Sequence, residues 1–205
     1  MKHIGFVGAS GLMGHGMAKN IRAKGFELSI TVHQRTEPVQ DLLAAGAKRV
    51  AGYADLAACD AVVICVTGSP QVEAVVTGPN GLLSKARKGL IVIDTSTSEP
   101  DSTRRLAALC AEKGVVYVDA PLTRTPVEAE QGRLNTMVGA SNEVFEKISP
   151  LLQAYCENVF HVGETGAGHI VKLLNNFVSQ AICTATAEAF AVGTKAGVDV
   201  RQLVR

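Results

Sequence analysis

The sequence predicts a doubly wound α/β fold, in which helices cover both faces of a mainly parallel sheet. Short, uniformly apolar runs alternate with segments of helical periodicity, which is typical of consecutive strand–helix–strand units. A glycine-rich turn separates the first apolar run from the first helical segment. Polar and glycine residues cluster just after the apolar runs, at the edge where such sheets bind ligands.

The composition fits a soluble chain with reduced thiols. Of the 205 residues, 47% are apolar and 19% are charged, which is enough apolar surface for a core. The net charge of +1 gives no reason to expect a nucleic acid, and no apolar run approaches the roughly 20 residues of a membrane span. Five scattered cysteines without a Cys-x-x-Cys pair argue against disulfides or zinc. We expect a cytoplasmic protein that binds neither nucleic acid, membrane nor metal.

Predicted strands alternate with predicted helices through the first half of the chain. Residues 4–7 form an apolar strand, and a helix with Met13, Met17 and Ile21 on one face follows until Gly25 ends it. The other elements of this part are strands at residues 28–32, 61–66, 90–94 and 115–118, and helices at residues 38–45, from residue 72 onward and at residues 101–112.

The remainder begins with a shaped loop at residues 119–134, because this stretch has two prolines and no hydrophobic period. We place the only domain boundary near Gly163, between a Rossmann domain at residues 1–163 and the start of an all-helical second domain at residues 164–205. The other predicted elements are strands at residues 134–138 and 158–161, a helix at residues 143–154, and a long linking helix that ends at Ala196 before Gly197.

The glycine turn reads Gly-x-x-Gly-x-x-Gly. Glycines let the backbone approach a pyrophosphate, and the helix N-terminus that follows offers free N–H groups and a positive dipole end. The spacing is one residue longer at the front than Gly-x-Gly-x-x-Gly, so a purely structural turn is the alternative. We predict that the cofactor contacts lie at Gly8, Ala9, Ser10, Gly11, Leu12, Met13 and Gly14.

A second signal concerns the adenosine ribose of the cofactor, which such folds hold about 20 residues past the glycines. There the chain carries Arg35 and Thr36 instead of an acidic residue. A cation suits a 2′-phosphate, so we predict NADP(H) as the preferred cofactor and NAD(H) as the alternative. Glu37 lies close by, and an ordinary loop arginine is the other interpretation of Arg35.

Residues 163–176 join a glycine-punctuated loop to an apolar helix that contains one lysine. Asn176 lies four residues after Lys172, so both side chains share a helix face. A cation beside an amide can hold an oxygen-rich substrate, whereas a solvated lysine is the alternative. His169, in the same stretch, is either a general acid or a histidine that packs or caps the helix start.

Four segments, in this order, resemble the β-hydroxyacid dehydrogenase family, which includes 3-hydroxyisobutyrate dehydrogenase, tartronate semialdehyde reductase and glyoxylate/succinic semialdehyde reductases. They span nearly the whole chain. The Gly-Ala-Gly-His-x-Val-Lys stretch is also similar to 6-phosphogluconate dehydrogenase, which usually has a histidine where this chain has Asn175. The four segments are residues 11–20, residues 94–97, residues 119–123 with Ala129, Gly132 and Leu134, and residues 166–168 with Lys172, Asn175 and Asn176.

The resemblance implies hydride transfer between NADP(H) and a small anionic 2- or 3-hydroxy acid or the matching aldehyde-acid. It assigns proton transfer at the carbonyl oxygen to Lys172, and an ammonium does stabilise a developing alkoxide. It also assigns substrate orientation to Asn176 and a hydrogen bond to the substrate carboxylate to Thr123. The implied cofactor lining consists of Val66, Thr67 and Thr97.

The substrate loop departs from the family, where Ser-Gly-Gly is usual, because it reads Thr123-Arg124-Thr125. An Arg-Thr pair is similar to the branch that reduces sulfolactaldehyde. We therefore expect an anionic substrate, a sulfonate or a carboxylate, at these three residues with its acid group on Arg124. The alternative is an Arg124 that turns to solvent or to the cofactor phosphate.

Length is a further departure, because family members continue into an all-helical domain that closes the cleft and often forms the dimer. This chain ends soon after the linking helix. We expect a homo-oligomer through that domain where it is complete. The second functional hypothesis is a catalytically inactive NADP-binding module. The third is a 6-phosphogluconate dehydrogenase-like enzyme, which Asn175 and the missing Ser-Gly-Gly disfavour.

Overall fold

The computed structural model describes residues 1–32 and 36–203 of the chain. These divide into two compact units, Met1–Val171 and Lys172–Arg205.

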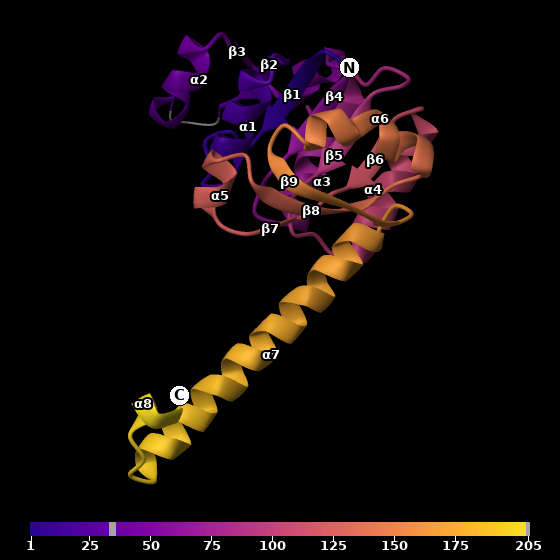
Figure 1. Ribbon diagram of the computed structural model, residues 1–205. Coiled ribbons are helices and arrows are strands. Elements are labelled where there is room, and N and C mark those ends of the chain that lie inside the picture. Colours follow the sequence, from indigo (N-terminus) through magenta and orange to yellow (C-terminus); the bar gives the residue numbers. More distant parts are fainter. Residues whose placement is uncertain (33–35, 204–205) are drawn as a thin grey trace. The chain divides into compact units, whose positions relative to one another are not determined.

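In the first unit, the described residues form one nine-stranded sheet (Figure 1). Six of its strands run parallel, in the order β3 (Lys48–Val50), β2 (Glu27–Thr31), β1 (His3–Val7), β4 (Ala61–Ile64), β5 (Ile91–Asp94) and β6 (Val116–Asp119). Strand β8 (Leu134–Gly139) is antiparallel to β6 and to the two-residue β7 (Leu122–Thr123), and β9 (Cys156–Gly163) is parallel to β8. The predicted mainly parallel, doubly wound sheet is confirmed.

Helices cover both faces of this sheet, which explains why its central strands are apolar throughout. In β4, Ala61 and Val63 pack in one core cluster, and Val62 and Ile64 pack in the other. The first cluster includes residues of α1 (Gly14–Ala23), α2 (Gln40–Ala44), α5 (Pro126–Glu130) and α6 (Asn142–Leu152). The second includes residues of α3 (Ser69–Thr77), α4 (Pro100–Glu112) and the 3₁₀ helices η2 (Tyr53–Ala58) and η3 (Leu82–Ser84).

Two regions differ from the sequence prediction. The loop predicted at residues 119–134 contains β7 and α5. The signal for α5 is local: Thr125 and Glu128 form a capping box, with a proline at the first helical position. The edge strand β3 and the 3₁₀ helix η2 are not among the predicted elements, whereas the helix predicted at residues 38–45 is present as the 3₁₀ helix η1 (Glu37–Val39) followed by α2. Strand β3 is short and largely exposed, so it shows no apolar run.

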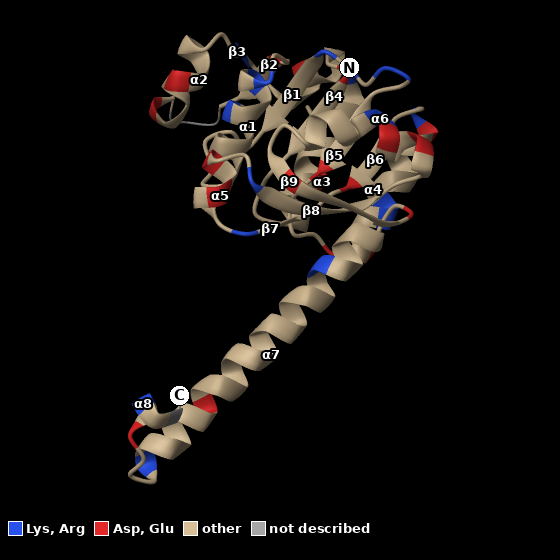
Figure 2. Cartoon of the chain, viewed as in Figure 1, with Lys and Arg blue, Asp and Glu red and all other residues tan. Residues whose placement is uncertain are grey.

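The second unit consists of most of α7 (Ala167–Lys195) and of α8 (Val200–Leu203). Helix α7 begins in the first unit and ends just before Gly197, whose φ of +83° favours glycine. No charged residue lies between Lys172 and Glu188 on this helix (Figure 2). Even so, no helix among the described residues is long and apolar enough to cross a membrane.

Candidate cofactor and substrate site

The turn between β1 and α1 requires glycine at two of its three glycine positions. Gly8 has a φ of +94°, and a Cβ there would lie 1.9 Å from the Cys65 carbonyl oxygen. A Cβ at Gly14 would lie 2.1 Å from the carbonyl oxygen of Gly8. The Gly11 N–H donates to that same oxygen over 2.9 Å and closes the turn. The turn is therefore a compact cradle without side chains at its base.

The predicted cofactor residues of this turn fall into two groups. Ser10, Gly11 and Leu12 are exposed, and Leu12 is 81% exposed although it is apolar. Ala9 and Gly14 are buried, so they shape the turn: Ala9 packs its methyl group into the core, and Gly14 leaves room for the Gly8 carbonyl oxygen. The turn lies at the carboxyl end of β1, which has β2 on one side and β4 on the other, so the strand order reverses between β1 and β4. Open α/β sheets bind their ligands at such a switch point.

The turns after β4 and β5 meet at the same edge of the sheet. The Val66 N–H donates to Ser96 Oγ over 3.1 Å, and the Ser96 N–H donates to Asp94 Oδ1 over 2.9 Å. Thr67 and Thr97, on these two turns, are exposed. The three residues predicted to line the cofactor, Val66, Thr67 and Thr97, are thus brought together at one edge.

Arg35, the residue on which the preference for NADP(H) rests, lies outside the described residues. Thr36 is half-buried and precedes η1. A cavity of about 260 Å³ lies at the carboxyl end of β2, where such folds hold the adenosine of a dinucleotide. Its lining residues are Thr31, Val32, Ala51, Gly52, Tyr53 and Asn80.

In the substrate loop, Thr123 lies on β7 and pairs with Asn135 of β8. Arg124 has a φ of +80°, unusual for a residue with a side chain. Its Nη1 donates to the Arg133 carbonyl oxygen over 2.5 Å and pairs with Glu157. The guanidinium is therefore held by one carboxylate and one main-chain carbonyl oxygen, and its side chain stays partly exposed.

Thr125 serves as the N-cap of α5. Its N–H and its hydroxyl both donate to the carboxylate of Glu128, over 3.0 and 2.5 Å. These hydrogen bonds hold the pKa of Glu128 below its usual value. Both polar groups of Thr125 are thus engaged within the helix that it begins.

Lys172 and Asn176 lie on α7, four residues apart, and both are half-buried. Asn175, three residues after Lys172, is exposed. Desolvation by burial lowers the pKa of Lys172. This is the direction that a general acid needs in order to release a proton near neutral pH.

Asp94 and Asp119, which lie in two of the family-like segments but have no individual role in the sequence prediction, are buried carboxylates that end β5 and β6. Asp94 Oδ2 accepts hydrogen bonds from Ser98 Oγ at 2.9 Å and from the Tyr117 hydroxyl at 3.0 Å. Burial raises the pKa of Asp119, although N–H donors from Gly166 and His169 oppose the shift. A buried acid directly after an apolar strand is a signal in the sequence for such a polar cluster.

Comparison with known proteins assigns the chain to a family. Residues 3–163 match the family described as the NAD binding domain of 6-phosphogluconate dehydrogenase. Residues 166–205 match the family described as NAD-binding of NADP-dependent 3-hydroxyisobutyrate dehydrogenase. The chain belongs to the β-hydroxyacid dehydrogenase family.

Within the β-hydroxyacid dehydrogenase family, the 2-(hydroxymethyl)glutarate dehydrogenase of Eubacterium barkeri is 39% identical over 95% of this chain and 64% of its own length. The NAD-dependent L-serine dehydrogenase of Pseudomonas aeruginosa is 35% identical, over 99% and 68%. The structure of Mycobacterium tuberculosis 3-hydroxyisobutyrate dehydrogenase with L-serine superposes with a TM-score of 0.88 at 26% identity, over 99% and 68%. The chain therefore spans about two thirds of the length of these dehydrogenases.

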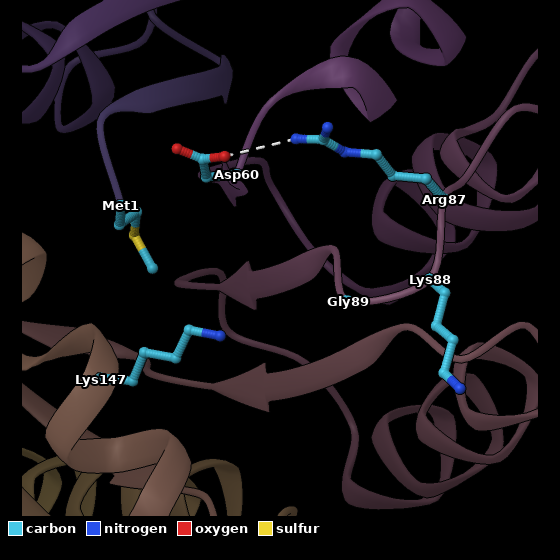
Figure 3. A pocket seen from close by; sticks show the side chains of 6 residues that line it. All are labelled: Met1, Asp60, Arg87, Lys88, Gly89 and Lys147. Carbon is cyan, nitrogen blue, oxygen red and sulfur yellow. Dashed lines mark hydrogen bonds and ion pairs between the residues drawn. The ribbon is translucent and has the colours of Figure 1, made fainter.

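A different cavity, of about 290 Å³, lies at the amino edge of the sheet (Figure 3). Met1, Asp60 and Gly89 on its wall precede β1, β4 and β5, whereas the glycine turn follows β1. Arg87 pairs with Asp60 inside it. This cavity therefore lies at one end of the strands, and the site that the β-hydroxyacid dehydrogenase motifs indicate lies at the other end. Among the described residues, no group of three or more His, Cys, Asp or Glu side chains is placed to hold a metal ion.

Proposed function

We propose that the protein transfers a hydride between NADP(H) and a small anionic 3-hydroxy acid, with the corresponding aldehyde-acid as the oxidised partner. The observation that carries the proposal is Lys172, a half-buried lysine on an otherwise apolar helix turn, with its pKa lowered by burial. The names of three relatives agree on the substrate. 2-(Hydroxymethyl)glutarate, L-serine and 3-hydroxyisobutyrate all carry a hydroxymethyl group on the carbon next to a carboxylate.

The turn after β1 fits a dinucleotide, because the glycine cradle leaves room that a Cβ at Gly8 or Gly14 would fill. When bound, NADPH supplies the hydride. Lys172 donates a proton to the carbonyl oxygen as the carbon is reduced, and in the oxidation direction it takes the proton back. Its positive charge also stabilises the developing alkoxide. Asn176, on the same helix face, orients the substrate.

The substrate carboxylate is bound by Thr123 and by the outer edge of Arg124. Both observed contacts of the Arg124 guanidinium use Nη1. Nε and Nη2 have no partner among the described residues, and together they form the bidentate edge that suits a carboxylate or a sulfonate. Glu157 then acts as the partner that orients the guanidinium. We assign Thr125 to the cap of α5 and not to the substrate.

The preference for NADP(H) over NAD(H) rests on Arg35 and Thr36 in place of an acidic residue after β2. Relatives of both kinds exist, since one matching family is named for an NADP-dependent enzyme and one relative for an NAD-dependent enzyme. The ratio of kcat/KM for NADPH and NADH tests this preference. An Arg35→Asp variant should reverse it.

The test of the proposed function is NADPH oxidation by the full-length protein, followed by absorbance, with a panel of acidic aldehydes. The panel contains tartronate semialdehyde, succinic semialdehyde, glyoxylate and sulfolactaldehyde. Lys172→Ala should lower kcat by at least 100-fold, within the range that general acid catalysis contributes. Lys195→Ala, which removes the other lysine of α7, should leave kcat unchanged.

Two alternatives predict other outcomes. An inactive NADP-binding module would bind NADPH without turnover on any aldehyde of the panel. A decarboxylating enzyme similar to 6-phosphogluconate dehydrogenase would release carbon dioxide from a 3-hydroxy acid in the oxidation direction. Equal turnover by the wild type and by Lys172→Ala would contradict the role proposed for the lysine.

A further inference from the structure

A buried polar cluster around His169 has no role in the proposed chemistry. His169 belongs to the first unit and is fully buried, and both of its ring nitrogens have partners. Nε2 lies 3.1 Å from the Ser96 carbonyl oxygen, and Nδ1 lies 2.7 Å from Thr103 Oγ1. Because a carbonyl oxygen only accepts, Nε2 carries the hydrogen and donates to the main chain of the turn after β5.

The main chain at His169 is held independently of this ring. Asp119 Oδ1 accepts from the Gly166 N–H over 2.6 Å, and Oδ2 accepts from the His169 N–H over 2.9 Å. Glycine is needed for this close approach, because a Cβ at Gly139 would lie 2.4 Å from Asp119 Oδ1 and one at Gly168 would lie 2.4 Å from the Met137 carbonyl oxygen. The anchor of this turn therefore does not depend on the imidazole.

Ser96, which accepts from the ring, connects both turns that are proposed to line the cofactor. Its N–H is bound to Asp94, its hydroxyl accepts from the Val66 N–H, and its carbonyl accepts from His169. Val66 and Thr67 follow β4, and Thr97 is the next residue after Ser96. One side chain thus orients the turn after β5 directly, and through Ser96 it orients the turn after β4.

We propose that His169 is a positioning residue for the cofactor: through Ser96 it holds the turns of Val66–Thr67 and Thr97 in the conformation that binds the cofactor. This inference rests on the proposed NADP(H) binding. Full burial excludes the alternative of a general acid that meets the substrate.

The surroundings explain why this position needs a polar ring. The carboxylates of Asp94 and Asp119 lie 3.7 and 3.9 Å from Nε2 and Nδ1. An apolar side chain of similar size would fill the space but leave the Ser96 carbonyl oxygen without its donor, and an unsatisfied buried acceptor is expensive. The turn would then relax away from its present conformation.

The experiment measures the Kd of NADPH, by fluorescence, for the full-length wild type, His169→Leu and His169→Gln. His169→Leu keeps volume without a donor, whereas the glutamine amide can still donate to Ser96. We expect His169→Leu to raise the Kd about tenfold, as the loss of one buried hydrogen bond predicts, and His169→Gln to restore part of it. His161→Leu is the matched control. His161 Nε2 also contacts a carbonyl oxygen, that of Ala140 at 2.6 Å, but His161 lies on β9 and not beside the turns after β4 and β5.

A merely structural role of His169 would lower the Tm and leave the Kd of the folded protein unchanged, so circular dichroism and Tm are measured on every variant. A folded His169→Leu with the Kd of the wild type overturns the inference. If that variant does not fold, Thr103→Val removes the partner of Nδ1, together with the hydrogen bond from Thr103 Oγ1 to the Glu99 carbonyl oxygen. An unchanged Kd in this variant overturns the inference as well.

A double-mutant cycle with Ser96→Ala tests the route through Ser96. If both residues act on the same turn, the double variant raises the Kd by less than the product of the two single effects. Independent, multiplying effects overturn the route. A wild type that binds NADPH but reduces no aldehyde would contradict only the proposed function, whereas a wild type that binds no NADPH overturns both.

Discussion

At the residue scale, Arg124 adds both backbone strain and a positive charge to the substrate loop. The family resemblance implies glycine at this position, but this chain places a side chain there at a φ of +80°, a conformation that costs about 1–2 kcal/mol for an L-residue. The contacts of its guanidinium with Glu157 and with the Arg133 carbonyl oxygen offset part of this strain. A charged group is thereby held in a loop that is otherwise built for small residues.

Arg124→Gly should raise the KM for an acidic aldehyde at least tenfold, because the bidentate edge for the acid group is lost. The free energy of unfolding should change by less than about 1 kcal/mol, since relief of backbone strain offsets the lost surface ion pair and the freer unfolded chain. Steady-state kinetics and urea unfolding measure both. Arg133→Ala, which removes the other arginine beside Glu157, is the control. An unchanged KM in Arg124→Gly would sink the role of Arg124 in substrate binding.

Tyr155 and Tyr117 form a second residue-scale comparison, since both are buried and differ in their hydroxyl partners. The Tyr155 hydroxyl has no hydrogen-bond partner among the described residues, whereas that of Tyr117 donates to Asp94. Tyr155→Phe should therefore raise the free energy of unfolding by about 1 kcal/mol, and Tyr117→Phe should lower it by about 1–3 kcal/mol. Urea unfolding monitored by circular dichroism measures both. Equal destabilisation by the two variants would contradict this account.

At the scale of elements, α1 connects the glycine turn to the substrate loop. Gly16 of α1 packs against the backbone of α5, where a Cβ would lie 2.4 Å from the Ala129 carbonyl carbon. The Asn20 amide donates to the Gly16, Ala129 and Glu130 carbonyl oxygens. His15 lies between Glu130 of α5, at 2.6 Å, and Asp41 of α2, at 3.0 Å. Helix α5 is therefore fixed to the helix that follows the glycine turn.

The ion pairs of His15 should make stability depend on pH. Partial burial opposes its charged form, but hydrogen bonds to Glu130 and Asp41 raise the pKa of His15 above 6.5. A raised pKa gives stability that is fully present below about 6.5 and is lost as pH rises through the folded-state value. Hydrogen bonds to His15 lower the pKa values of Asp41 and Glu130, so their contribution is lost as pH falls below about 4.

His15→Ala should therefore destabilise the protein most near pH 5–6, by about 0.5–1 kcal/mol because all three side chains are partly exposed, and less at pH 8. Urea unfolding across this pH range is the measurement. Lys19 of α1 also pairs with Glu130. Since a lysine stays charged between pH 5 and 8, Lys19→Ala should show a difference that does not vary with pH. A flat difference for His15→Ala would contradict the prediction.

At the scale of the whole molecule, the sheet separates two sets of residues. The carboxyl edge collects the glycine turn, the turns after β4 and β5, and the His169 cluster. The amino edge carries the cavity of Figure 3, with Arg87, Lys88 and Lys147 on its wall. Because the central strands are parallel, all polar residues that directly follow a strand arrive at one edge. Burial also favours the protonated thiols of Cys59 and Cys65, because it raises their pKa values to about 11.

The sequence by itself determined the fold class, the order of the main strands and helices, the glycine turn and the family. These features depend on local patterns: apolar runs, helical periodicity and glycines that only a few turns accept. Only the tertiary structure decided that β8 runs antiparallel, that Arg124 pairs with Glu157, and that His169 donates to Ser96. Arg124 and Glu157 lie 33 positions apart in the chain, and Ser96 and His169 lie 73 positions apart. Local sequence preferences do not predict contacts between residues so far apart. The physical reason is that partner choice for a buried polar or charged group depends on which strand ends the parallel sheet brings together.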